Sequence, residues 1–196
     1  MSVAPILPQE VRKITGEEFL RLVDSGFFAE DEKVELLDGI LVHMSPQGAA
    51  HIKAVLQLTK WLSRLAGEEY SVLVQSNVKL SETSIIEPDV AVISGNPDEF
   101  SARLPEAADL GLVVEVADSS TANDAQLKML LYAKAGIAEY WIVNIRARRL
   151  EVHTDPKENG YGVIHIVDEF HQVAPLLFPE SPIEVVRLLP PKPLVD

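Results

Sequence analysis

Apolar residues recur at helical spacing in three segments of the chain, residues 14–26, 48–67 and 120–136. In the first segment, Thr15 is a suitable N-cap and Glu18 follows three residues later, which is the spacing of a capping box. Each segment ends at a glycine, the residue that usually terminates a helix. The pattern therefore predicts three helices separated by long non-helical stretches.

Between these helices, short apolar runs and alternating patterns predict strands. Residues 34–46 are typical of a hairpin, because Asp38-Gly39 is a two-residue turn signal between apolar segments. Residues 110–118 are almost continuously apolar, as in a mid-sheet strand, and the next helix can connect them in parallel to residues 139–145. Further unbroken strands are predicted at residues 70–80, 85–93, 149–154 and 162–170. This order predicts an α/β (α+β) fold, a mixed β-sheet flanked by helices.

The length of 196 residues suits a single domain over residues 15–188, although two smaller domains are also compatible with it. Residues 1–14 are then an N-terminal extension, and the proline-rich residues 189–196 are a tail. The absence of cysteine excludes disulfides and thiolate metal sites. No signal-peptide pattern opens the chain and no apolar run approaches about 20 residues, so we expect a cytoplasmic protein without membrane contact.

Carboxylates interrupt two of the apolar strands. Glu87 and Asp89 lie within residues 85–93, and Glu115 lies between two valines of residues 110–118. An unpaired ionised carboxylate is costly to bury, so these positions need a compensating partner. Side chains two apart on a strand share a face, and neighbouring strands can bring such carboxylates to one place. Carboxylates this close repel one another unless a cation or a proton lies between them.

The third helix adds Asp124 and Lys128, four residues apart and therefore on one helical face. Alone, each polar residue has an ordinary explanation: Asp89 in a turn, Glu115 paired with an arginine, and Asp124 with Lys128 as a surface ion pair. Together they favour a functional site at one strand-to-helix edge. A hard divalent ion such as Mg²⁺ takes oxygen ligands of this kind.

Several motifs together resemble one family. The segments "EPDVAVI", "LVVEVADSS" and "DAQLKMLLYAKAGIAEYWIVN", preceded by "VELLDGILVHMSP" and "GAAH", are similar to the Uma-type restriction endonucleases of the PD-(D/E)XK nuclease superfamily. The resemblance covers residues 15–180. It implies a restriction-endonuclease-like core.

The resemblance also implies roles for individual residues. Asp89 matches the aspartate of the "PD" element and Glu115 the acidic residue of the "(D/E)XK" element, and both would bind Mg²⁺ (or Mn²⁺) with the Val116 carbonyl. Ala117 stands where the superfamily usually has lysine, and Lys128 on the next helix would take over the catalytic role of that lysine. It would orient the attacking water and stabilise charge on the phosphate.

Three further positions match the family as auxiliary residues. Asp124 stands one turn before the lysine, Glu35 is a candidate acidic residue near the metal, and His51 lies near the start of the second helix. Structural roles are open for all three: a helix-surface ion pair for Asp124, a strand-edge charge for Glu35 and packing for His51. Glu87 is expected to be a neighbour of the site rather than a ligand.

The function that this resemblance implies is a metal-dependent DNA endonuclease, with a non-cutting binding or assembly module as the alternative. A hydrolase of another phosphodiester is a third interpretation. Basic residues that could contact DNA are Lys53, Lys60 and Arg64 on the second helix and Arg146, Arg148 and Arg149 after residues 139–145. The net charge of −13 predicts weak, salt-sensitive DNA binding, or a homodimer that forms a local basic cleft.

Overall fold

The computed structural model describes residues 12–95, 97–118 and 122–192, with the backbone alone for residues 122–125. Its centre is a six-stranded mixed sheet in the order β10-β9-β8-β7-β6-β3. Strands β7 and β8 are parallel, and the other neighbours in this sheet are antiparallel. The six strands are β3 (Tyr70–Val74), β6 (Val90–Ser94), β7 (Leu110–Ala117), β8 (Glu139–Asn144), β9 (Arg149–Lys157) and β10 (Gly160–Asp168).

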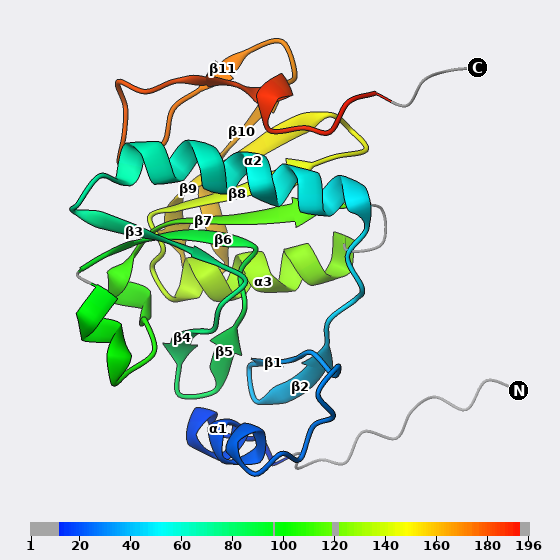
Figure 1. The fold of residues 1–196 in the computed structure, drawn as a ribbon, viewed down its shortest axis with the longest axis vertical. Coiled ribbons are helices and arrows are strands. Elements are labelled where there is room, and N and C mark those ends of the chain that lie inside the picture. Colours follow the sequence, from blue (N-terminus) through cyan, green and yellow to red (C-terminus); the bar gives the residue numbers. More distant parts are fainter. Residues whose placement is uncertain (1–11, 96, 119–121, 193–196) are drawn as a thin grey trace, which may run out of the picture.

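Helices cover both faces of this sheet (Figure 1). Helix α2 (Ala49–Ala66) packs on one face through Leu58, Leu62 and the sheet residue Trp141. Helix α3 (Ala122–Lys134) lies on the other face, where Tyr132 and Tyr140 belong to a second core cluster. The helix also connects β7 to β8, so the predicted parallel crossover and the mixed α/β fold class are confirmed.

A smaller four-stranded sheet, β2-β1-β5-β4, lies beside the large one and carries helix α1 (Gly16–Asp24). The predicted hairpin and capping box are confirmed: β1 pairs with β2, and the Thr15 side chain accepts from the Glu18 amide. Asp38 and Gly39 both have positive φ, which is the conformation of a tight hairpin turn. The four strands are β1 (Val34–Leu37), β2 (Ile40–His43), β4 (Val78–Ser81) and β5 (Ser84–Ile86).

The C-terminal segment returns to the core. Strands β11 (Gln172–Val173) and β12 (Ile183–Glu184) form a two-stranded ribbon, after which Leu188 and Leu189 are buried in the core cluster to which α2 also contributes. None of the described helices is both long and apolar enough to cross a membrane.

Two of the predicted strands are wrong as continuous elements. Residues 70–80 divide into β3 and β4, and residues 85–93 divide into β5 and β6, so each segment passes from one sheet to the other. Gln75 breaks the first segment with a left-handed φ of 47°, and Pro88 interrupts the second because it has no N–H for a ladder. The breaks are adjacent, since the Gln75 N–H donates to the Asp89 carbonyl at 3.2 Å. Glu87 and Asp89 therefore do not share the face of one strand.

Candidate active site

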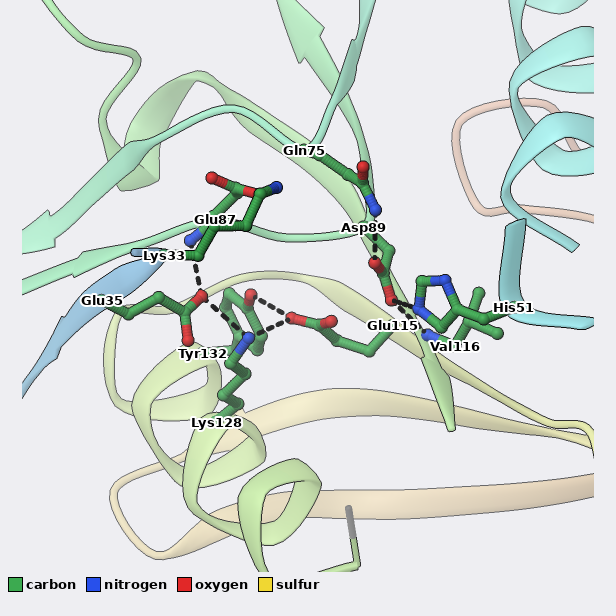
Figure 2. A network of polar contacts seen from close by, with 10 residues as sticks. All are labelled: Lys33, Glu35, His51, Gln75, Glu87, Asp89, Glu115, Val116, Lys128 and Tyr132. Carbon is green, nitrogen blue, oxygen red and sulfur yellow. Dashed lines mark hydrogen bonds and ion pairs between the residues drawn. The ribbon is translucent and has the colours of Figure 1, made fainter. Parts of the chain in front are cut away.

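A cavity of about 190 Å³ lies at the carboxyl end of β7 and the N-terminus of α2. Its walls include the loop from β2 into α2. Six side chains that the sequence singled out line this cavity: Glu35, His51, Glu87, Asp89, Glu115 and Lys128. Figure 2 shows them as two connected groups, one around Asp89 and one around Glu115.

The strand register explains why the two central carboxylates lie close together. Val90 of β6 pairs with Val114 of β7 in antiparallel register, so the next position outward sets Asp89 opposite Glu115. Both are largely buried, with 6% of Asp89 and 8% of Glu115 exposed. The chain thus brings these carboxylates to one cavity from two neighbouring strands, although Asp89 itself precedes its strand.

Three donors hold Asp89. His51 Nε2 and the Val116 N–H both lie 2.9 Å from Oδ2, and the Gln75 amide donates to Oδ1 at 3.3 Å. Burial acts to raise the pKa of Asp89, but the hydrogen bonds from His51, Val116 and Gln75 outweigh it, and the pKa falls below its usual range. Asp89 is therefore an ionised acceptor at neutral pH.

His51 is the third residue of α2, whose N-cap, Gly48, contributes no side-chain hydrogen bond. The positive end of the helix thus favours a carboxylate at this place. Because ionised Asp89 only accepts, His51 Nε2 carries the proton of their hydrogen bond. His51 Nδ1 is buried without a hydrogen-bond partner in the described part of the chain.

Glu115 is held from α3. Lys128 Nζ and the Tyr132 hydroxyl both contact Oε1, at 3.3 and 2.9 Å. Burial raises the pKa of Glu115 to about 8; Lys128 opposes this rise, whereas Asp89 and Glu35 add to it. In the protein alone, Glu115 therefore keeps its proton at neutral pH. Burial also raises the pKa of Tyr132 well above its usual value, so its hydroxyl remains a donor.

Lys128 bridges two acids. Its Nζ lies 2.8 Å from Glu35 Oε1, and the same oxygen accepts from the Glu87 N–H at 2.8 Å. Both partners are deeply buried, with 4% of Lys128 and 1% of Glu35 exposed. The Glu87 side chain instead forms an ion pair with Lys33 at 3.0 Å. Glu35 is thus a direct partner of the lysine, and Glu87 supports it through its backbone.

The structure describes the remaining sequence-predicted positions only in part. Asp124 lies one turn before Lys128 in α3, but its side chain is outside the described residues. Val116, expected to contribute its carbonyl, contributes its N–H to Asp89. Sequence reasoning missed Tyr132 and Gln75. The four-residue spacing from Lys128 could have indicated Tyr132, whereas Gln75 depends on a backbone turn that no local pattern announces.

The donor set is compatible with a hard divalent ion. Among the described residues, no group of three or more His, Cys, Asp or Glu side chains is arranged to hold a metal. Magnesium, however, is usually bound by one or two carboxylates, with water and substrate phosphate completing its octahedron. Asp89 and Glu115, which line the same cavity, supply the two carboxylates that such a magnesium site uses.

A family model described as "Putative restriction endonuclease" (Uma2) matches residues 17–185. The chain belongs to this family. The Uma2 chain is also similar to a solved structure, a putative nuclease belonging to DUF820 from Anabaena variabilis ATCC 29413, with a TM-score of 0.74. That similarity covers 89% of this chain and 97% of the other at 13% sequence identity, so it establishes the fold alone. No curated protein matches the sequence.

Proposed function

We propose that this Uma2 protein is a DNA endonuclease that hydrolyses phosphodiester bonds with Mg²⁺ or Mn²⁺. One observation carries the proposal: Asp89 and Glu115, from neighbouring strands, line one cavity with Lys128 beside them. Buried acids next to a lysine at the end of a sheet form a cation site able to accept a phosphate. The membership of the chain in a restriction-endonuclease family points to DNA as the substrate.

Asp89, Glu115 and the Val116 carbonyl would hold the ion. When bound, the metal polarises the scissile phosphate and makes a water molecule more acidic. Asp89 is already ionised and oriented by its three donors, whereas Glu115 has to release its proton before it can serve as a ligand. Lys128 keeps positive charge at the site, where it would orient the attacking water and stabilise the transition state. Glu35 holds this lysine in place.

DNA contacts are expected on the outer surface of α2. Lys53, Lys60 and Arg64 are exposed there. The arginines that follow β8 fit this role less well, because Arg148 and Arg149 already pair with carboxylates at 2.6 and 2.7 Å. With a net charge of −13, DNA binding should be weak, and added salt should weaken it further because it competes with these basic residues for the phosphates. A homodimer and a cytoplasmic location stay predictions from the sequence.

Plasmid cleavage in Mg²⁺ or Mn²⁺ tests the proposal. Asp89→Ala and Glu115→Ala should each lower the cleavage rate by at least about two orders of magnitude, because each removes a metal ligand. Glu180→Ala, which removes an exposed carboxylate that does not line the cavity, is the matched control and should cleave like the parent. Parent-like cleavage by Asp89→Ala would show that this site is not the catalytic one.

The alternative is a nuclease-fold module that binds but does not cut. It is favoured by the acidic net charge and by Lys128 already pairing with two carboxylates. Calorimetric titration with MnCl₂ separates the two functions before any substrate is known. Binding that disappears in Asp89→Ala supports the endonuclease, whereas absence of binding by the parent supports the module.

A further inference from the structure

Tyr132 lies fully buried on α3, one helical turn after Lys128. Residues four apart lie on one face of a helix, and both side chains reach the same atom, Glu115 Oε1. The shorter of the two contacts is the tyrosine hydroxyl, at 2.9 Å. Figure 2 shows this pair on one side of the Glu115 carboxylate, with its other oxygen on the side of Asp89.

Packing alone does not account for a tyrosine at this position. Its ring contacts Tyr140 with centroids 5.0 Å apart, and a phenylalanine would make the same contact. The hydroxyl adds a buried polar group that needs a partner. Tyr161, on the same face of the sheet, meets that need with a backbone carbonyl, that of Ile137, at 2.9 Å. Tyr132 instead uses the side chain that forms half of the proposed metal site.

We propose that Tyr132 is a positioning residue for the metal site: its hydroxyl, together with Lys128, holds Oε1 of Glu115 and so presents the other oxygen to the ion. The inference rests on the proposed function. A carboxylate held at one oxygen cannot rotate freely about its terminal bond, so it loses less conformational entropy when the ion binds. Removing such a supporting hydrogen bond typically lowers metal affinity about 10- to 100-fold.

The paired variants are Tyr132→Phe, at a fully buried residue, and Tyr161→Phe, at a partly buried one; each deletes one hydroxyl and one hydrogen bond at about 2.9 Å. We expect Tyr132→Phe to raise the calorimetric Kd for MnCl₂ about tenfold and Tyr161→Phe to leave it unchanged. Both should have similar melting temperatures, because they lose similar contacts. If cleavage is measurable, Tyr132→Phe should need about tenfold more Mn²⁺ for half-maximal rate.

The outcomes separate the positioning role from the proposed function. If the parent protein does not bind Mn²⁺, the proposed function fails, and the role of Tyr132 fails with it. If the parent binds and Tyr132→Phe binds equally well, Tyr132 is only a packing residue and the proposed function stands. In a Glu115→Gln background, adding Tyr132→Phe should cost no further affinity. A further loss there would show that the hydroxyl acts by another route.

A measurement on the parent sequence covers the case in which Tyr132→Phe does not fold. The chain has four tyrosines, so protein labelled with 3-fluorotyrosine gives four fluorine signals. Variants of the other three tyrosines assign the signal of Tyr132 by elimination. Mg²⁺ should shift this signal most, because its hydroxyl contacts the carboxylate that binds the ion. A Tyr132 signal that does not move in saturating Mg²⁺ would overturn the inference.

Discussion

The two halves of the site are buried almost equally but treat their carboxylates in opposite ways. Around Asp89, three hydrogen-bond donors, one of them a backbone N–H, hold the pKa below its usual range. Around Glu115, burial raises the pKa to about 8, although Lys128 and Tyr132 both contact it. The cost of burying a charge is similar in both halves, so the donors decide which carboxylate stays ionised.

The difference arises from how the donors are shared. The donors of Asp89 are Gln75, at the break between β3 and β4, His51, at the start of α2, and the Val116 N–H, near the end of β7. All three donate to Asp89 alone. Lys128 is divided between Glu115 and Glu35, and the contact with Glu35 is shorter by 0.5 Å. Asp89 is therefore ionised at neutral pH, whereas Glu115 would have to lose a proton before it could bind a cation.

The largest effect on stability is expected from Lys128→Met. It removes the ammonium group that lies 2.8 Å from Glu35 and 3.3 Å from Glu115, while both acidic side chains stay buried. Such a change costs about 3–5 kcal/mol of unfolding free energy. The matched control is Lys79→Met, which breaks the more exposed pair with Glu82 and should cost about 1 kcal/mol or less. Urea unfolding at pH 7 measures both, and equal costs would show that the buried bridge contributes little.

The next effect is a pH dependence with a defined sign. The pKa of Glu115 is about 8 in the folded chain against an ordinary 4.5, so the folded state holds a proton that the unfolded state releases. Its contribution, at most about 5 kcal/mol, is complete below about pH 4.5 and is lost as the pH rises through about 8. We expect the unfolding free energy in EDTA to fall over that window. Glu115→Gln should flatten the fall, and an unchanged slope would contradict the raised pKa.

How far the sequence could predict this site depends on which interactions are local. The helices, the hairpin and the parallel crossover follow from periodicity, caps and turn residues, and they are confirmed. The acids and Lys128 could be named because each interrupts an apolar pattern or matches a family motif. The asymmetry between Asp89 and Glu115 could not, because it depends on the strand breaks at Gln75 and Pro88. The breaks bring Gln75 beside Asp89, so the Gln75 side chain donates a hydrogen bond to that acid alone.

The smallest effect is expected at Gln75, which contributes both a strained backbone and a long hydrogen bond. Glycine adopts its φ of 47° without a steric penalty, so Gln75→Gly should change stability at pH 7 by less than about 1 kcal/mol. The variant also removes the 3.3 Å donor to Asp89, so the pKa of Asp89 should rise towards its usual value. A carboxylate whose pKa is lower in the folded state stabilises the fold above its unfolded-state pKa. This stabilisation is lost as the pH falls through the folded-state pKa.

Acid unfolding of Gln75→Gly should therefore begin at a slightly higher pH than in the parent. Gln75→Asn is the companion variant, since asparagine also accepts a left-handed backbone but is too short to reach as far. If acid unfolding of both variants begins at the same pH as in the parent, His51 and the Val116 N–H alone set the charge of Asp89. The left-handed backbone at Gln75 would then serve to bring the two sheets together rather than to keep Asp89 ionised.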